Sequence, residues 1–265
     1  MKYSIITINY NNRDGLERTI QSVINQTCQD FEFIIIDGGS TDGSVDIIKK
    51  YVDRIDYWVS EQDKGIYNAM NKGILQAHGD YLNFMNSGDC FYDENVLSLF
   101  EDRCDADVIY GNVLWGNTLH TYPSNMSFHE FCIHGYNHQS TFFNVNIFSK
   151  YLYDEDLKIV SDWKLFALLL LDKTYIIKHT VDIFAIFDMT GISSNREKRE
   201  EETQIVLKEI LPLPLFLDYQ KWCRINSPII ELLPQLSKTN RLHKLIFKFI
   251  NYIIYIRNLF KINLF

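Results

Sequence analysis

Short apolar runs alternate with segments of helical period along the first 90 residues. Four apolar runs predict strands, at Tyr3–Ile8, Glu32–Ile36, Tyr57–Val59 and Tyr81–Met85. Apolar residues spaced three or four positions apart predict helices between them, at Gly15–Gln26, Ser44–Val52 and Gly65–Ala77. In the second of these helices Val45, Ile48 and Val52 are expected to face inward. This order predicts right-handed crossovers and an α/β fold with a mostly parallel sheet flanked by helices.

The pattern is less regular from residue 107 to residue 210. A helix that is apolar nearly all round, Trp163–Leu171, is expected to be buried. Phe142–Phe148 is expected near an edge of the sheet. The charge-rich segment Ser193–Ile210 predicts a solvated helix face or a mobile loop. Further strands are expected at Asp107–Tyr110, Tyr175–His179 and Asp182–Asp188.

The character of the chain changes after residue 210. Four of the five prolines lie between residues 212 and 234, which is typical of a linker-like segment. We therefore expect one large domain over residues 1–210 and a helical C-terminal extension over residues 211–265.

The tail Arg241–Phe265 has the period of an amphipathic helix. Six Lys or Arg and no Asp or Glu occur from Leu232 to Phe265, although the whole chain has a formal charge of −8. The first 231 residues therefore carry −14, since −8 minus +6 is −14. Basic residues beside bulky apolar ones favour a helix in a membrane interface. The alternative is a helix that packs on the main domain or on a second subunit.

Composition excludes several classes of protein. With 265 residues, 46% of them hydrophobic, the chain can bury a sizeable core, which disfavours disorder. The five cysteines are odd in number and form no Cys-x-x-Cys pair, so neither a disulfide framework nor a zinc site is expected. This usage fits a reducing cytoplasm. Met1-Lys2 leads directly into a strand, which disfavours a signal peptide, and no run of 18 apolar residues predicts a spanning helix.

Two predicted strands end in aspartates. Asp89 closes the segment Asn86-Ser-Gly-Asp89, and Asp37 follows the strand Glu32–Ile36. Open α/β sheets bind their ligands beyond the carboxyl ends of the strands. A divalent cation between a carboxylate and substrate phosphates needs few protein ligands, so Asp89 predicts such a site, assisted by Asn86 and Ser87. The alternative is that Asp89 only caps the next helix.

The segment Asp37-Gly-Gly-Ser-Thr-Asp-Gly43 is a second candidate site. Its glycines allow close backbone approach, and Asp42 or Ser44 can cap the following helix, whose N-terminal amides favour anions. Asp37 can accept hydrogen bonds from a base or a ribose. The segment is neither a Walker loop nor a Gly-x-Gly-x-x-Gly motif, and a tight turn with a helix cap is the alternative.

Three further polar positions are candidates. Asp63 and Lys64 lie in a Gly-flanked polar segment where they can meet a nucleotide, or form an ordinary loop. Asp162, at the start of the apolar helix, can cap that helix or accept the proton of an attacking hydroxyl. His134 and His138 have the i, i+4 spacing of metal ligands, but Gly135 weakens a helix there, and a structural or acceptor-facing histidine is favoured.

Together these segments resemble the family 2 glycosyltransferases, which have the GT-A fold. Ser4-Ile-Ile-Thr-Ile-Asn-Tyr-Asn-Asn12 resembles the opening strand and turn of that family. Asp37-Gly-Gly-Ser-Thr-Asp42 resembles its Asp-Gly-Ser-x-Asp nucleotide segment, with one additional glycine. Gly79-Asp-Tyr-Leu-Asn-Phe-Met85 matches the strand before its metal motif, and Asn86-Ser-Gly-Asp89 stands where the family carries an Asp-x-Asp-type motif. Ser161-Asp162 stands where the family often has Glu-Asp.

The resemblance implies transfer of a sugar from a nucleotide diphosphate to an acceptor hydroxyl, with inversion at the anomeric carbon. It implies that Asp37 binds the base, with Asn9 and Tyr10 lining that pocket. It also implies that Asp89 coordinates Mg²⁺ or Mn²⁺ and that Asp162 is the general base. The other residues assigned to the nucleotide are Ser40, Asp63, Lys64 and Asn71, and those assigned to the acceptor or to assisting the metal are Asn86 and His138.

The chain departs from the family's pattern at three places. Asn86 and Gly88 replace acidic residues of the metal motif, which puts strict metal dependence in question. Met70 replaces the frequent arginine before Asn71, so one phosphate contact is expected to be missing. The Gln-x-x-Arg-Trp motif of processive polysaccharide synthases is absent, so a single addition is expected rather than polymerisation.

The sequence therefore predicts a glycosyltransferase of the hexosyltransferase type in surface-polysaccharide biosynthesis. The expected donor is a UDP-sugar and the expected acceptor a hydroxyl of a lipid-linked glycan, with no nucleic acid partner. The protein is expected in the cytoplasm, held on the inner face of the cell membrane by residues 241–265. Two alternatives are a degenerate sugar-nucleotide-binding or scaffold protein and a sugar-nucleotide pyrophosphorylase. The pyrophosphorylase is disfavoured because no glycine-rich N-terminal loop with Arg and Lys is present.

Overall fold

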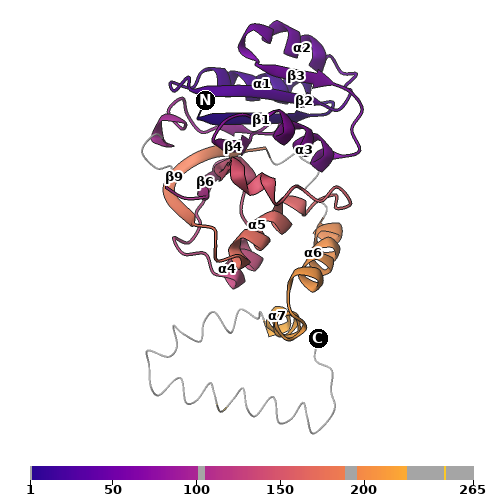
Figure 1. The fold of residues 1–265 in the computed structure, drawn as a ribbon, viewed down its shortest axis with the longest axis vertical. Helices are drawn as coiled ribbons and strands as arrows, with labels where there is room; N and C mark the ends of the chain where they lie inside the picture. The colour runs from indigo at the N-terminus through magenta and orange to yellow at the C-terminus, as the bar shows by residue number, and fades with distance from the viewer. Residues whose placement is uncertain (1, 101–104, 189–195, 226–247, 249–265) are drawn as a thin grey trace. The chain divides into compact units, whose positions relative to one another are not determined.

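The computed structural model describes residues 2–100, 105–188, 196–225 and 248. The chain forms two compact units, Met1–Val206 and Leu207–Phe265, where the sequence predicts a division after Ile210. The first unit carries the sheet and most of the helices (Figure 1).

One nine-stranded sheet forms the core of the first unit. Its strand order is β3-β2-β1-β4-β8-β6-β9-β5, and β7 pairs with β6. The strands are β1 (Tyr3–Asn9), β2 (Phe31–Asp37), β3 (Tyr57–Ser60), β4 (Tyr81–Phe84), β5 (Cys90–Phe91), β6 (Val108–Trp115), β7 (Thr118–His120), β8 (Thr141–Asn144) and β9 (Ile177–Phe187).

Helices cover this sheet and lead into the second unit. The α-helices are α1 (Arg13–Ile24), α2 (Ser44–Lys50), α3 (Ile66–Gln76), α4 (Phe128–His134), α5 (Ser161–Leu171), α6 (Arg196–Ile210) and α7 (Leu213–Ile225). Four short 3₁₀ turns are η1 (Val52–Arg54), η2 (Ser98–Phe100), η3 (His138–Ser140) and η4 (Val145–Ser149).

The N-terminal strands confirm the predicted α/β arrangement. β1, β2, β3 and β4 pair in parallel, so their carboxyl ends meet at one edge of the sheet. The crossovers β1-α1-β2 and β2-α2-β3 run one way along the sheet, whereas β3-α3-β4 runs back. Right-handed connections therefore place α1 and α2 on one face and α3 on the other.

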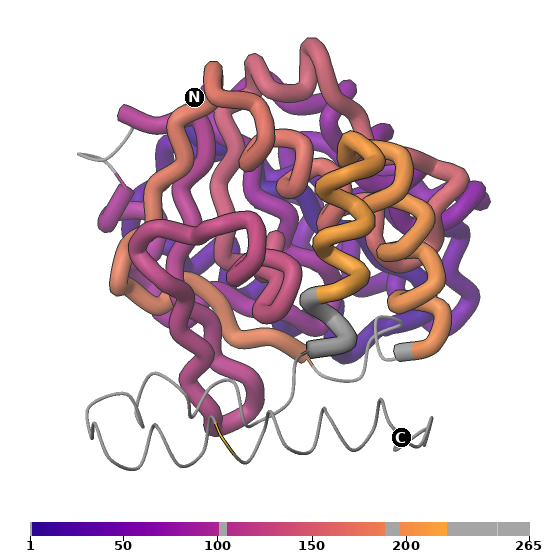
Figure 2. Tube along the Cα trace, turned by 90° about the horizontal axis from the view of Figure 1, so that it is seen from below, coloured from indigo at the N-terminus to yellow at the C-terminus, as the bar shows by residue number. Residues whose placement is uncertain are grey.

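The later strands make the sheet mixed instead of mostly parallel. β8 pairs antiparallel with both β4 and β6, so it lies inside the sheet. The expectation of a sheet edge near Phe142–Phe148 is therefore wrong, and Phe142 and Phe143 are fully buried between neighbouring strands. Figure 2 shows β9 in orange beside β6 in magenta, and their pairing is parallel. β9 is one continuous strand where the sequence predicts two.

Two burial predictions for helices need correction. Val52 is 44% exposed, because α2 ends at Lys50 and Val52 begins a 3₁₀ turn outside the helical period. Ile47 and Ile48 are the buried apolar residues of α2. Helix α5 is not buried all round, since Leu171 at its end is 41% exposed.

Helix α6 carries one buried charge among exposed ones. The prediction of a solvated face holds for its exposed glutamates, but Glu202 is only 7% exposed. Its carboxylate accepts hydrogen bonds from the backbone N–H groups of Lys158, Ile159 and Val160. Glu202 therefore fixes the turn that begins α5.

In the second unit, the described residues include helix α7. Leu213, Leu215 and Leu217 on it are each at least 46% exposed. Among the helices that the structure describes, none has the length and apolarity needed to cross a membrane. The predicted amphipathic tail, residues 241–265, lies outside the described residues except for Lys248.

Candidate functional site

The carboxyl edge of the parallel strands gathers several of the predicted residues. Asn9 and Asp37 are register partners at the ends of β1 and β2, and Asp37 pairs in turn with Ser60 at the end of β3. Asn86 follows β4 two residues after its last residue. Because parallel strands end together, residues far apart in sequence line one ridge, as predicted.

Asp37 organises this ridge and is not open to a ligand. It is fully buried, and its carboxylate accepts from Asn9 Nδ2 at 2.7 Å, from Ser60 Oγ at 2.5 Å, and from Ser40 through both N and Oγ, at 2.9 and 2.6 Å. Burial acts to raise the pKa of Asp37, but these hydrogen bonds outweigh it and lower the pKa below its ordinary value. Four donors use the lone pairs of the carboxylate. Direct binding of a base by Asp37, as the resemblance implied, therefore does not fit this geometry.

The carboxylate of Asp63 lies beside the Gly38 backbone, whereas the carboxylate of Asp37 is occupied by protein donors. A Cβ at Gly38 would lie 3.1 Å from Asp63 Oδ2 and 3.2 Å from the ring of Tyr10, so these two side chains flank the Gly38 backbone. Asp63 Oδ1 accepts from Lys72 Nζ at 2.6 Å, and Tyr10 is 66% exposed. Tyr10 and Asp63, both assigned to the nucleotide, are thus placed together, beside Lys72 of helix α3.

The other predicted nucleotide residues take different positions. Ser40 bridges Asp37 and the backbone N–H of Asn11. Lys64 is exposed. Asn71 is buried, where its amide bonds both the N–H and the carbonyl of Tyr153, so it holds a neighbouring loop.

Asp89 is a buried carboxylate whose two oxygens both accept from protein donors. It is 5% exposed, with Gln139 Nε2 2.7 Å from Oδ2 and the Asp188 N–H 2.8 Å from Oδ1. Burial raises the pKa of Asp89 to about 6, against the lowering effect of these hydrogen bonds. Asp89 therefore ties the end of β9 and the turn η3 to the segment after β4.

The described residues near Asp89 offer few further protein ligands for a divalent cation. Hard cations take several oxygen ligands, and within the described residues no group of three His, Cys, Asp or Glu converges. Gly88 has a φ of +108°, and a Cβ there would lie 2.6 Å from Asp188 Oδ2, so that carboxylate occupies the space of a side chain at position 88. Gln139 and Asp188 each occupy one lone pair of Asp89, so its assignment as a metal ligand stays a prediction.

The pKa of Asp89 makes a prediction about stability. Its folded value of about 6 exceeds the ordinary 3.8, so the folded state binds more protons between these pH values. The contribution of Asp89 is fully present below the unfolded pKa and is lost as the pH rises through 6. The difference in free energy of unfolding between wild type and Asp89→Asn should fall by about 2 kcal/mol from pH 4 to pH 7. Urea unfolding across this range measures it.

The exposed Asp156→Asn is the matched control for that measurement. If the difference in free energy of unfolding between wild type and Asp89→Asn rose with pH, the buried carboxyl would be stabilised in its ionised form.

Asp162 lies in a network of four side chains. At the start of α5, its Oδ1 accepts from the Tyr67 hydroxyl at 2.9 Å and its Oδ2 lies 3.0 Å from His138 Nδ1. His138 Nε2 lies 3.0 Å from Asn86 Nδ2. Burial acts to raise the pKa of Asp162, but the bonds from His138 and Tyr67 lower it overall. The predicted residues Asn86, His138 and Asp162 are thus brought together.

Several residues that place this network were not predicted. Asn83 on β4 donates to the carbonyls of Gln139 and Thr141, which fixes η3 beside the end of β4. Tyr136 donates to the Asp162 carbonyl at 2.8 Å, and Glu202 holds the turn before α5. Of the other partners, Tyr67 lies three residues after Lys64 and Gln139 is adjacent to His138, and the sequence predicted both Lys64 and His138 as site residues.

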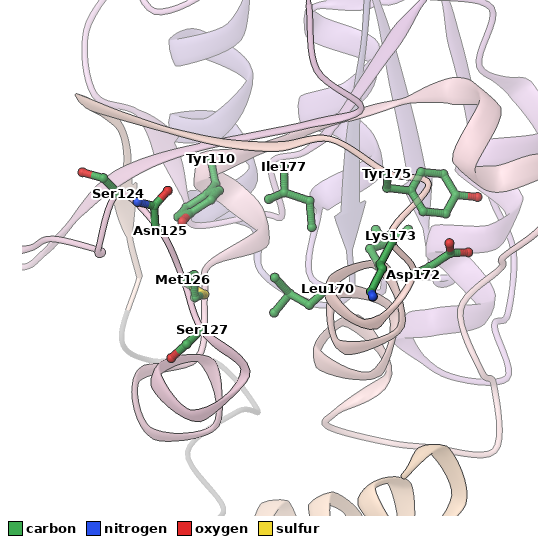
Figure 3. A pocket seen from close by; sticks show the side chains of 11 residues that line it. Tyr110, Ser124, Asn125, Met126, Ser127, Leu170, Asp172, Lys173, Tyr175 and Ile177 are labelled. Carbon is green, nitrogen blue, oxygen red and sulfur yellow. The ribbon is translucent and has the colours of Figure 1, made fainter. Parts of the chain in front are cut away.

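A separate cavity of about 400 Å³ lies at the other end of α5 (Figure 3). Its lining includes Tyr110, Met126, Leu170 and Ile177, with Asp172 and Lys173 at the end of the helix. An eleven-residue helix is about 16 Å long, so this cavity is not part of the Asp162 network.

Comparison with known proteins identifies relatives of the chain. The sequence model of the family described as Glycosyl transferase family 2 matches residues 4–152. An uncharacterised glycosyltransferase of Mycobacterium tuberculosis, Rv1514c, is 32% identical over 209 residues, covering 73% of this chain and 78% of the relative. A cholesterol galactosyltransferase of Borreliella burgdorferi is 32% identical over 108 residues, which cover 40% of this chain and 30% of that protein.

Two solved structures share the fold. S. aureus TarS 1–349 in complex with UDP-GlcNAc superposes with a TM-score of 0.63 at 20% identity, covering 80% of this chain and 67% of that one. The mannosyltransferase PcManGT of Pyrobaculum calidifontis, in complex with GDP-Man and Mn²⁺, gives a TM-score of 0.61 at 12% identity, covering 96% of this chain and 81% of that one. At 20% and 12% identity, these two structures show that the fold is GT-A-like and nothing more.

Proposed function

The chain belongs to glycosyl transferase family 2 and is a glycosyltransferase, and we propose that it is an inverting enzyme that uses a UDP-sugar. The observation that carries this proposal is the partly buried network of Asp162, His138 and Tyr67 beside the carboxyl ends of the parallel strands. A carboxylate with a lowered pKa stays ionised at neutral pH, so it is ready to accept a proton.

In the proposed reaction, Asp162 takes the proton of an acceptor hydroxyl as its oxygen attacks the anomeric carbon. The bond from that carbon to the β-phosphate oxygen breaks, and the nucleoside diphosphate leaves with the bonding electrons. Attack from the face opposite the leaving group inverts the anomeric configuration. Tyr67 and His138 occupy one lone pair on each Asp162 oxygen, so further lone pairs remain for the acceptor.

The donor is proposed to bind along the ridge of strand ends. Tyr10 and Asp63 flank the Gly38 backbone, where an aromatic ring and a carboxylate can stack on and accept from a nucleoside base. UDP is favoured because the TarS structure, which shares this fold, holds UDP-GlcNAc. Asp37, Ser40 and Asn71 would support this site through the backbone, and Lys64 would reach it from the exposed side.

Of the two cations in the sequence-based prediction, Mn²⁺ is present in one neighbour, PcManGT, with its nucleotide sugar. In this chain Asp89 is the carboxylate that would hold such a cation, and no step of the proposed reaction is assigned to it.

Thermal stabilisation by nucleotides tests the donor. We expect UDP and UDP-sugars to raise the melting temperature by several degrees, because a ligand of the folded state stabilises it by mass action. GDP and GDP-sugars should give a smaller shift. After EDTA treatment the UDP shift should remain, and Mn²⁺ should add little. If no nucleotide diphosphate shifts the melting temperature, the proposed function is wrong.

The acceptor is proposed to be a hydroxyl of a lipid-linked glycan, reached from the inner face of the cell membrane. The support is the basic, apolar sequence of residues 241–265 and the exposed leucines of α7. The related cholesterol galactosyltransferase bears a name that specifies a lipid acceptor.

Flotation with liposomes tests the membrane proposal. Replacing Lys238, Lys244, Lys248 and Lys261 with glutamine should reduce binding to anionic vesicles strongly, since each basic residue near such a surface contributes about 1 kcal/mol. Binding to neutral vesicles should change little and serves as the control. Unchanged flotation after deletion of residues 241–265 would exclude the tail as the anchor.

A further inference from the structure

Two side chains of the segment after β4 contact two side chains of η3 at hydrogen-bond distance, although the segments lie about fifty residues apart in sequence. In one pair, Asn86 Nδ2 lies 3.0 Å from His138 Nε2. In the other, Gln139 Nε2 donates to Asp89 Oδ2 at 2.7 Å. Asn86, which stands where the family often has an acidic residue, therefore faces a histidine.

His138 connects Asn86 to the carboxylate of Asp162. The side chains of His138 and Asp162 are 14% and 19% exposed, and Nδ1 lies 3.0 Å from Oδ2. An ionised carboxylate only accepts hydrogen bonds, so the shared hydrogen belongs to His138 Nδ1. In the neutral ring this leaves a lone pair on Nε2, and the Asn86 amide presents an N–H donor to it.

The amide oxygen of Asn86 supports the same arrangement. Asn86 Oδ1 is buried and has no hydrogen-bond partner among the described residues. Leaving such an atom unpaired costs free energy, which the bond from Nδ2 to His138 must offset. The Asn86 amide is therefore oriented through its Nδ2, by the contact with His138 Nε2.

We propose that His138 is a positioning residue for Asp162 and that Asn86 holds His138 in the tautomer with hydrogen on Nδ1. This inference rests on the proposed function, in which Asp162 accepts the proton of the acceptor hydroxyl. Asn86 then orients the base through a histidine where related sequences have a metal-motif acid. The pair Asp89–Gln139 anchors the adjacent residue of η3 and keeps His138 in place.

Nitrogen NMR of histidine-labelled full-length protein tests the tautomer without any substrate. We expect the resonances that disappear in His138→Gln to show a neutral ring protonated on Nδ1. In Asn86→Asp the new carboxylate accepts from Nε2–H, so the ring should become doubly protonated. A wild-type ring protonated on Nε2, or an unchanged ring in Asn86→Asp, would overturn the proposal.

Steady-state kinetics test the effect on catalysis. His138→Ala should lower kcat about 100-fold with little change in the donor KM. His138→Asn, which restores a donor toward Asp162, should recover about tenfold of that loss, and Asn86→Asp should lower kcat about tenfold. His134→Ala, at an exposed position of α4, is the matched control and should be neutral.

An increase in kcat for Asn86→Asp with Mn²⁺ would overturn the proposal, because residue 86 would then act as a cation ligand. If the wild type neither binds nor transfers a nucleotide sugar, the proposed function fails. The NMR result would still decide the tautomer in that case.

Discussion

Asp162→Asn is expected to remove transfer almost completely while leaving donor binding intact. Asparagine keeps the size of the side chain and can still accept from Tyr67 or His138, but it cannot take a proton. Loss of a general base typically costs 10²–10⁴ in rate, so kcat should fall about 1,000-fold. Release of UDP measures the rate, and titration calorimetry with UDP measures binding.

Asp156→Asn makes the same chemical change at an exposed residue five positions before α5 and should leave both quantities unchanged. A near wild-type rate in Asp162→Asn would identify another base. A protein that binds UDP but transfers no sugar even as wild type would match the scaffold alternative.

Asp37→Asn is expected to destabilise the protein and to abolish nucleotide binding. The carboxylate accepts from Asn9, Ser40 and Ser60 and so joins the ends of three strands. An amide group at position 37 would turn an N–H toward one of these donors. Since hydrogen bonds to a buried charge contribute about 1.5–3 kcal/mol, the free energy of unfolding should fall by about 3 kcal/mol.

Asp63→Asn is the matched comparison, because Asp63 is not joined to the strand ends in this way. Its unfolding free energy should stay within about 1 kcal/mol of wild type, since it loses only a partly exposed ion pair with Lys72. Its affinity for UDP should fall about tenfold, since one hydrogen bond is worth about 1 kcal/mol or more. If Asp37→Asn were stable and only weak in binding, Asp37 would contact the ligand directly.

Asp37→Asn and Asp63→Asn distinguish a carboxylate that holds strand ends together from one that binds the nucleotide, two roles that look alike in the sequence. Both aspartates follow strands and lie within two residues of a glycine, and the family resemblance favoured Asp37 for the base. Whether the carboxylate is free depends on Ser40 and Ser60, and the latter comes from a different strand. No local pattern reports that Ser60 lies beside Asp37.

The hydrogen-bond partners of Asp89 are also beyond what a local sequence pattern can predict. The motif places it after β4, and this is where it lies. Its two partners come from residues 139 and 188, which reach it only because β8 inserts beside β4 and β9 ends nearby. Distant segments thus bury a carboxylate that the motif alone suggests is open to a ligand.

The sequence by itself determined the strands, the helices of the N-terminal half and the order of the acidic strand ends. These features depend on the local period of apolar residues, and parallel strands bring their ends together in any fold of this class. Only the tertiary structure decided which carboxylates are free, because Asn9 and Ser60, which donate to Asp37, come from neighbouring strands. It also decided that Asn86, His138 and Asp162 form one network, since an antiparallel strand inside the sheet brings η3 to the end of β4.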